Sequence, residues 1–311
     1  MRRRRVVLIG AMIALGMVVG LVPSGPAGAA PVPPPASMAA IGDSFTYGFA
    51  TGAPDCNGFV TCAAYSWSTG TGVQSHHQRL IAIEPAIAGN ATNAAVLGAP
   101  MSSFVGQATA VAGTQPDYVT VLLGGGDICF GATPTAQFAA QFRAGMDALT
   151  SASPGSLVLV ASIWDFESQR AAALAADPSA TFPFCQTFFN APATTRAATM
   201  DRVVDYNAAL AAECATYAAC RFDGNALFDH AWTAAELSPV DNFHPSVAGQ
   251  EMLAEVLWGA GYSWGTPGVT DVNLCKRGGW ASVTDDQGRP FRNQGDCVSH
   301  VVTGGRNPAR G

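Results

Sequence analysis

Short apolar runs alternate with amphipathic segments along most of the chain. The runs 118–123 and 157–162 are continuously apolar and rich in β-branched residues, which is typical of strands buried on both faces. The segments 135–150 and 194–217 have apolar residues at helical spacing. Because strands separated by helices pair in parallel and are covered on both faces, the pattern predicts an α/β fold.

Shorter elements complete the predicted order: strands over 40–42, 93–98 and 220–222, helices over 102–113 and 245–258, and a long insertion over 164–192. Ser102 or Ser103 would cap the first of these helices, and Pro245 would lie in the first turn of the second. In a parallel α/β sheet the ligand lies at the carboxyl ends of the strands. Residues that follow the predicted strands are therefore the first candidates for function.

The first 29 residues have the pattern of an export signal. Arg2 to Arg5 precede an apolar run over 6–22, and Ala27-Gly28-Ala29 has the small residues of a cleavage site. A retained membrane anchor is the alternative, because the apolar run is nearly long enough to span a bilayer. The Pro-rich linker 30–37 favours cleavage near Ala29 and a secreted protein.

The charge balance narrows the class of partner. The formal net charge is −6, and loss of the four signal arginines makes the mature protein still more acidic. A nucleic-acid-binding protein needs a basic face, so we expect no nucleic-acid partner. We also expect a monomer.

Eight cysteines in an exported chain predict disulfides. About 105 connectivities are possible for eight cysteines, so the pairing stays an expectation. Proximity favours three pairs and leaves the fourth: Cys56–Cys62, Cys214–Cys220, Cys275–Cys297 and Cys129–Cys185. No Cys-x-x-Cys motif and no histidine at ligand spacing accompanies them, so we expect no metal site.

A serine follows the first predicted strand, in Gly42-Asp43-Ser44-Phe45. A strand end that meets a tight turn and a helix start is where an α/β sheet presents a nucleophile. Asp and Ser are also preferred N-cap residues, so helix capping is the alternative. These residues alone leave the two interpretations open.

Asp241 and His244 lie three residues apart, just before the last predicted helix. Such a carboxylate can hold one imidazole nitrogen while the other nitrogen faces a nucleophile. Taken alone, a histidine near a helix start is as well explained by capping. With Ser44 the two residues complete a Ser-His-Asp set, which favours the nucleophile interpretation of Ser44.

These motifs resemble the sequence blocks of the SGNH hydrolases, also called the GDSL esterase/lipase family. Gly42-Asp43-Ser44-Phe45 resembles the nucleophile block, Asp241-x-x-His244-Pro245 the last block, and Gly98 the glycine block. The resemblance covers roughly residues 39–262. It implies a flavodoxin-like three-layer α/β/α sandwich with a small parallel sheet over 38–265, and hydrolysis of lipid, acylated-sugar or small acyl esters without metal or cofactor.

The resemblance also implies a role for each site residue. Ser44 would be the acylated nucleophile, His244 the general base and then the general acid, and Asp241 the residue that orients His244. The backbone N–H groups of Ser44 and Gly98 would donate to the oxyanion. Contact with lipid or with cell-envelope glycan would be transient.

One position departs from the family pattern. The third block is usually Gly-x-Asn-Asp, and here it is Gly124-Gly125-Gly126-Asp127, so the Asn that donates to the oxyanion is missing at Gly126. Loss of one such donor costs about 3 to 4 kcal/mol. The chain is then a slower esterase, an esterase with a substitute donor, or a secreted binding protein without catalysis. Retained hydrolysis is favoured because nucleophile and base are intact, and Gly126→Asn is expected to raise the rate.

Other polar residues allow two interpretations each. His76 and His77 are expected to be solvated residues of a helix. Asp165 and Glu167 follow a predicted strand and could form the acid pair of a glycosidase, but the serine mechanism already accounts for the cleft. The run of glycines at 124–126 lacks the Lys-Ser/Thr of a phosphate loop.

The end of the chain has a different composition. Residues 270–302 form a small Gly- and Trp-containing element that we expect to be clipped by Cys275–Cys297 and to be too small for a core of its own. It could contact the cell envelope or a glycan. The last residues, 303–311, are expected to be disordered.

Overall fold

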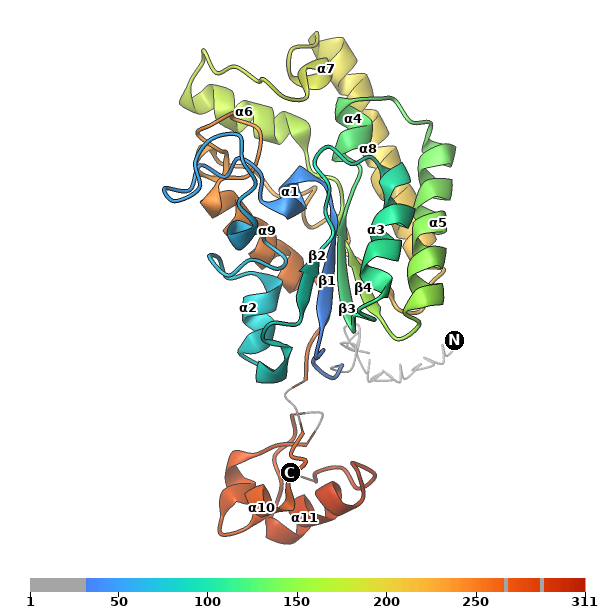
Figure 1. Cartoon of the computed structure of the whole chain (residues 1–311), viewed down its shortest axis with the longest axis vertical. Coiled ribbons are helices and arrows are strands. Elements are labelled where there is room, and N and C mark those ends of the chain that lie inside the picture. Colours follow the sequence, from blue (N-terminus) through green and yellow to red (C-terminus); the bar gives the residue numbers. More distant parts are fainter. Residues whose placement is uncertain (1–31, 266–267, 286–287, 311) are drawn as a thin grey trace, which may run out of the picture. The chain divides into compact units, whose positions relative to one another are not determined.

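A parallel five-stranded sheet forms the centre of the computed structural model, which describes residues 32–265, 268–285 and 288–310 (Figure 1). The strands are β1 (Met38–Gly42), β2 (Ala91–Asn93), β3 (Tyr118–Leu122), β4 (Leu157–Val160) and β5 (Cys220–Phe222), in the order β2-β1-β3-β4-β5. Ala40 of β1 pairs with Asn93 on one side and with Thr120 on the other. The predicted α/β class is therefore confirmed.

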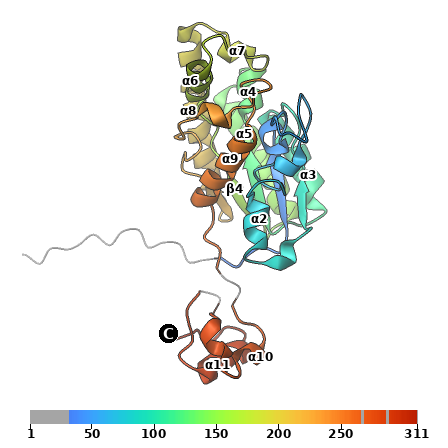
Figure 2. The same ribbon diagram turned by 90° about the vertical axis from the view of Figure 1, so that its left-hand side faces the viewer.

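Helices cover both faces of this sheet. One face carries α3 (Phe104–Ala112), α5 (Thr135–Ala152) and α8 (Ala193–Cys214), and the other carries α2 (His76–Ile81) and α9 (Val247–Ala260), as Figures 1 and 2 show. The arrangement is the expected three-layer sandwich. The remaining α-helices of the described residues are α1 (Ser44–Tyr47), α4 (Gly125–Cys129), α6 (Phe166–Ala176), α7 (Gln186–Phe189), α10 (Val272–Cys275) and α11 (Gln294–Val302).

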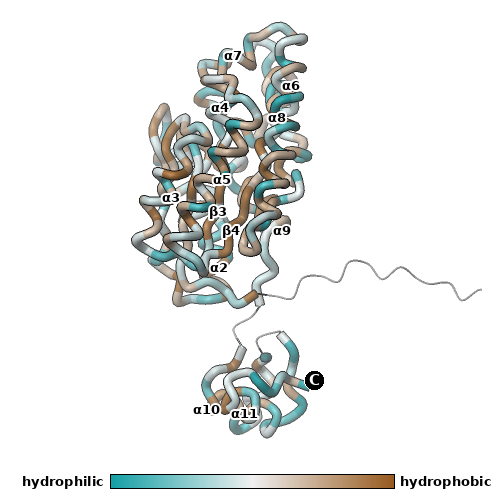
Figure 3. Tube along the Cα trace, turned by 90° about the vertical axis from the view of Figure 1, so that its right-hand side faces the viewer, coloured by the Kyte–Doolittle hydropathy of each residue, from teal (hydrophilic) through white to brown (hydrophobic). Residues whose placement is uncertain are grey.

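The core lies between the sheet and the helices. Every residue of β1 and β3 is buried, and Figure 3 shows the hydrophobic colouring concentrated along the inner strands. Phe138 of α5 stacks on Tyr206 of α8 with ring centroids 4.0 Å apart. Gly145 lets α5 approach α3, because a Cβ at this position would lie 2.1 Å from the Phe104 ring. Full burial of a phenylalanine such as Phe104 contributes roughly 1.5 to 3 kcal/mol.

Two predicted boundaries are wrong for local reasons. β2 ends at Asn93, because the Asn93 side chain accepts from Ala95 N (3.0 Å) and turns the chain, so 94–98 is not a strand. Helix α9 begins after Ser246, whose hydroxyl accepts from Gly249 N (3.1 Å). Pro245 therefore lies before the cap, where it forms a β-bridge with Leu237.

His76 and His77 are buried, which contradicts their expected exposure. Nδ1 of His76 lies 2.9 Å from the hydroxyl of Tyr118, and its ring packs edge-on against Trp67 and Trp258. Burial lowers the pKa of His76 to about 3. The aromatic neighbours come from three other parts of the sequence, so local spacing does not reveal this pocket.

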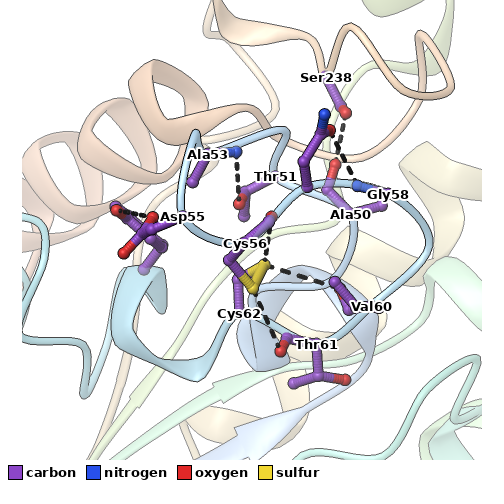
Figure 4. Close-up of a disulfide and its surroundings, with 12 residues drawn as sticks. Ala50, Thr51, Ala53, Asp55, Cys56, Gly58, Val60, Thr61, Cys62 and Ser238 are labelled. Atoms are coloured by element: carbon purple, nitrogen blue, oxygen red, sulfur yellow. Dashed lines mark hydrogen bonds between the residues drawn. A yellow bond between two sulfur atoms is a disulfide. The ribbon is translucent and has the colours of Figure 1, made fainter.

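The structure contains four disulfides, and they join the four pairs expected from the sequence: Cys56–Cys62, Cys129–Cys185, Cys214–Cys220 and Cys275–Cys297. Figure 4 shows the first, which closes a loop after α1. The hydroxyl of Ser238 donates to Ala50 O in the same loop. The loop is thereby fastened both to itself and to the segment that leads to His244.

Residues 268–310 have a small apolar cluster of their own, which contradicts the expectation that this element is too small for one. It consists of Val269, Cys275, Phe291, Cys297 and Ala309. The predicted disordered tail is also wrong up to Arg310. Ala309 is buried and its N–H donates to the Asp285 carboxylate (3.1 Å), while the Asn307 side chain donates to Ser299 Oγ (2.8 Å).

The predicted signal peptide, 1–29, and the start of the linker lie outside the described residues. Within the parts of the chain that the structure describes, no helix combines the length and the apolar character needed to cross a membrane.

Candidate active site

Ser44 begins helix α1 directly after strand β1. Oδ1 of Asp43 caps this helix by accepting from Phe45 N (3.0 Å). The strand end is held by Gln107 of α3, whose side chain accepts from Gly42 N (2.8 Å) and donates to Gly42 O (2.9 Å). Asp43 is therefore the residue that caps the helix, and Ser44 is the first residue of the helix.

Asp241 and His244 form a compact local unit. Oδ1 of Asp241 accepts from the backbone N–H groups of Phe243 and His244, both at 2.9 Å. Oδ2 lies 2.6 Å from His244 Nδ1, and both side chains are buried. The backbone of the loop thus holds the Asp241 carboxylate in place, and the carboxylate in turn holds the His244 imidazole.

Nε2 of His244 lies 3.0 Å from Ser44 Oγ. The structure therefore brings the three predicted residues into one hydrogen-bonded chain, although Ser44 and His244 are 200 positions apart. This is the geometry that lets a histidine take a proton from a serine while a carboxylate holds the ring.

Two buried glutamines hold the parts of this chain together, and sequence reasoning missed both. Gln250 of α9 donates to Phe45 O (2.9 Å) and accepts from Trp67 N (2.9 Å). Gln169 of α6 donates to Phe243 O (2.5 Å) and accepts from the Trp164 indole (2.9 Å). No motif marks these residues, because the backbone groups they bind are distant in the sequence.

A cavity of about 210 Å³ opens above Ser44. It is lined by Asp43, Ser44, Phe49, Leu97, Gly98, Gly125, Gly126, Cys129, Phe130, Trp164, Phe184, Phe243 and His244. The cavity therefore collects the predicted positions 44, 98, 126 and 244, while Asp241 lies behind the imidazole. Its walls are mainly aromatic and aliphatic.

The loop that carries Gly98 is tied to two elements of the site. Val96 N donates to Gly42 O (3.1 Å), and Met101 N donates to Oδ2 of Asp127 in α4 (2.7 Å). Gly98 has a φ of +66°, which favours glycine. Among the described residues, neither Ser44 N nor Gly98 N donates a hydrogen bond to the protein, so both are free to bind a ligand oxygen.

Gly126 is closely covered by this same loop. A Cβ at position 126 would lie 2.6 Å from Ala99 O and 2.7 Å from Gly98 O. These are backbone atoms, so a side chain fits only if the loop moves. The structure therefore argues against the expectation that Gly126→Asn raises the rate.

Two carboxyl groups near Ser44 have raised pKa values. Burial raises the pKa of Asp43 to about 7, against the hydrogen bond from Phe45 N and with a smaller contribution from charge repulsion by Asp127. Burial also raises the pKa of Asp127, against the opposing effect of the hydrogen bonds it accepts from the Thr133 hydroxyl (2.7 Å) and Met101 N.

The other candidate acids have structural partners. Asp165 caps α6 by accepting from Glu167 N (2.8 Å) and Ser168 N (3.1 Å), and Glu167 pairs with Arg196 (2.5 Å).

Trp67 and Phe166 are buried in the core and do not line the cavity, whereas Trp164 does. Within the described ranges, no three His, Cys, Asp or Glu residues gather as a metal site would require.

Solved structures similar to this chain include TesA and two esterases. TesA is 16% identical, with 72% of this chain and 97% of that chain covered and a TM-score of 0.44. The psychrotrophic esterase EstA from Pseudoalteromonas sp. is 13% identical, with 72% and 95% covered and a TM-score of 0.45. A family two carbohydrate esterase from Clostridium thermocellum is 12% identical, with 74% and 65% covered and a TM-score of 0.46.

A comparison with curated proteins gives no match. The model of the GDSL-like Lipase/Acylhydrolase family matches residues 40–252, which is more than half of the chain and includes both the Ser44 turn and the Asp241–His244 loop. The resemblance noted from the sequence motifs is thereby confirmed, and the chain belongs to the GDSL-like lipase/acylhydrolase family.

Proposed function

We propose that this protein hydrolyses carboxylic esters through an acyl intermediate on Ser44. The observation that carries the proposal is the continuous hydrogen-bonded chain from Ser44 through His244 to Asp241 at the wall of an apolar cavity. A serine is a weak nucleophile by itself, and an adjacent base oriented by a third group is what activates it.

In the proposed mechanism Ser44 Oγ attacks the ester carbonyl carbon as His244 Nε2 takes its proton. Asp241 holds Nδ1–H and stabilises the imidazolium. The oxyanion accepts from the N–H groups of Ser44 and Gly98. His244 then protonates the leaving alcohol, and water, activated by the same imidazole, releases the acid and restores Ser44.

The cavity supports an uncharged acyl group. Its walls include Phe49, Trp164, Phe184 and Phe243, and none of the described residues that line it is a lysine or an arginine. The apolar surface continues outward through Leu97 and Phe130, which are 45% and 69% exposed. We therefore infer a substrate with an apolar acyl chain, as in lipid and small acyl esters, in preference to acyl groups that carry a charge.

We also propose that the protein is secreted after cleavage near Ala29. The basic and apolar start of the chain supports export. Four disulfides support an oxidising compartment, because such bonds are rare in the reducing cytosol. The mass of the mature N-terminal peptide from an expressing cell would test the cleavage position.

The test of the proposed reaction is hydrolysis of p-nitrophenyl esters of graded chain length. Ser44→Ala should lower kcat/KM by at least about a thousandfold, since the oxyanion donors alone leave little of the rate. Ser151→Ala is the matched control, because Ser151 is an exposed residue of α5. Equal rates for Ser44→Ala and wild type would remove Ser44 from the reaction.

A fluorophosphonate probe separates an esterase from a binding protein that keeps only the fold. We expect the probe to modify Ser44 in the native protein, because His244 is positioned to activate it. A folded wild type that is neither labelled nor active would support the binding protein.

A further inference from the structure

Two phenylalanines are exposed among the described residues, and both lie beside the cavity that contains Ser44. Phe59 is 57% exposed and Phe130 is 69% exposed, whereas the other phenylalanines are buried or partly buried. A single exposed apolar residue is ordinary on a protein surface, but apolar residues that gather at one place mark a contact site.

Phe59, Leu97 and Phe130 form what we call the apolar rim of the cavity. Leu97 and Phe130 line the cavity, and Leu97 is 45% exposed. The two lie on adjoining segments, because a Cβ on Gly98 would lie 3.1 Å from the Phe130 ring. Phe59 meets the cavity through Phe184, a lining residue whose ring lies 5.7 Å from that of Phe59.

The backbone that carries the apolar rim is tied down at each of its three positions. The Cys56–Cys62 disulfide closes the loop of Phe59, and Phe130 directly follows the Cys129–Cys185 disulfide. The residue before Leu97 donates its N–H to the end of β1 (3.1 Å). The rim is therefore held in place before any contact is made, which lowers the entropy that a contact would cost.

The segments that carry or support the apolar rim contain no basic residue. Neither lysine nor arginine occurs in residues 44–62, 94–106, 124–134 and 180–190. Their charged residues are Asp127, which is buried, and Asp55, which is exposed and accepts from the Tyr65 hydroxyl (2.6 Å). An anionic lipid surface attracts basic residues, so the rim suits a surface without net charge.

We propose that the apolar rim docks the protein on the surface of an aggregated, electrically neutral lipid ester, with the opening of the cavity toward the lipid. The inference rests on the proposed hydrolysis of apolar acyl esters. Esters with long acyl chains aggregate in water, because water expels their apolar surface. A rim that borders the opening lets an acyl chain pass from the aggregate into the cavity without exposure to water.

Vesicle binding by the Ser44→Ala variant tests the docking surface separately from the reaction. We expect this variant to sediment with phosphatidylcholine vesicles, and we expect no stronger binding when phosphatidylglycerol replaces part of the phosphatidylcholine. Adding Phe59→Ser or Phe130→Ser should weaken the binding about tenfold, since each removes an exposed aromatic ring that would enter the lipid. Adding Phe59→Leu, which stays apolar, should keep most of it.

Val204→Ser is the matched control for these substitutions. Val204 is 51% exposed on α8 and is not one of the residues that line the cavity, so its replacement removes exposed apolar surface away from the rim. We expect it to leave vesicle binding unchanged. Circular dichroism would establish that each variant is folded.

A rate ratio gives a second measurement in the enzyme with Ser44 intact. We expect Phe59→Ser to lower the rate on emulsified triolein, below saturation, about tenfold relative to the rate on dissolved p-nitrophenyl butyrate, and Val204→Ser to leave this ratio unchanged. No vesicle binding, binding that requires phosphatidylglycerol, or equal effects of Phe59→Ser and Val204→Ser would overturn the proposal. Vesicle binding that depends on the rim, in a wild type that hydrolyses no ester, would support the docking surface and contradict the proposed function instead.

Discussion

Asp43 and Ser44 are neighbours in one turn, yet burial affects them differently. Asp43 is enclosed between the sheet and α4, while Ser44 is only partly buried and faces the cavity. An isolated carboxylate is costly to bury, so the protein favours its neutral form. The burial that raises the pKa of Asp43 should therefore also make the free energy of unfolding depend on pH.

Asp43→Asn tests this link between titration and stability. The unfolded chain ionises Asp43 near pH 3.8 and the folded chain only near pH 7, so the folded state holds an extra proton between these values. The contribution of Asp43 to stability is therefore greatest below pH 4 and falls as the pH rises to 7, by as much as about 4 kcal/mol. Because Asn does not titrate, the variant should gain on wild type across this range in urea unfolding at pH 4 and pH 8. A constant difference between the two proteins would contradict the raised pKa.

Gly126 gives a second prediction at the residue scale. Its Cβ would overlap Ala99 O and Gly98 O, so Gly126→Ala must displace the loop that holds the Gly98 N–H. We expect a loss of roughly 1 to 3 kcal/mol in stability and a clear fall in kcat. Gly131→Ala is the matched control, because no atom lies within 4 Å of its Cβ position. An unchanged kcat in Gly126→Ala would show that the loop adjusts without loss of the site.

Spacing and order in the sequence were enough to predict Ser44, Asp241 and His244 as a set. They were not enough for Gln107, Gln169 or Gln250, because each binds backbone atoms more than 60 positions away. The sequence also could not show whether an Asn side chain fits at position 126, because the backbone of the loop at Gly98 sets the space there.

At the scale of elements, the Cys129–Cys185 disulfide joins the end of α4 to the start of α7. Cys129 and Phe184 both line the cavity, and the Phe184 ring lies 5.1 Å from that of His244. The bond therefore anchors the segment that supplies one aromatic wall of the site.

Removal of this disulfide should affect both stability and substrate binding. Closing a loop of this length is worth about 4 kcal/mol in the chain-entropy model, against about 2 kcal/mol for the short Cys56–Cys62 loop. We expect the Cys129→Ala/Cys185→Ala variant to unfold at lower urea concentration than Cys56→Ala/Cys62→Ala and to have the higher KM. The reverse order for both quantities would mean that the long loop is held by its packing instead.

The helices and strands that have one strong hydrophobic pattern were predictable from the sequence. β3 and β4 are continuous apolar runs, and α5 has apolar residues at helical spacing, so each was placed within a few residues. The ends of β2 and α9 depend on side chains that bind nearby backbone, Asn93 and Ser246. Such bonds compete with regular structure without changing the apolar pattern.

At the scale of the whole molecule, the described residues form two separate apolar clusters. The larger draws its residues from Met38 to Trp264, and the smaller is confined to residues from Val269 to Ala309. Every residue that lines the cavity belongs to the range 43–244. The cavity and the three proposed catalytic residues therefore come from the part of the chain before the C-terminal element.

A chain that ends at Gly265 should therefore keep the reaction. Because a domain with its own core can fold alone, we expect kcat and KM for a soluble p-nitrophenyl ester within about twofold of the full chain. Circular dichroism would establish that the shortened protein is folded before the rates are compared. The Cys275→Ala/Cys297→Ala variant is the companion control, because it disturbs the same element without shortening the chain. A tenfold fall in kcat in a folded truncated protein would mean that residues 268–310 support the site, and the two clusters would then have to be treated as one unit.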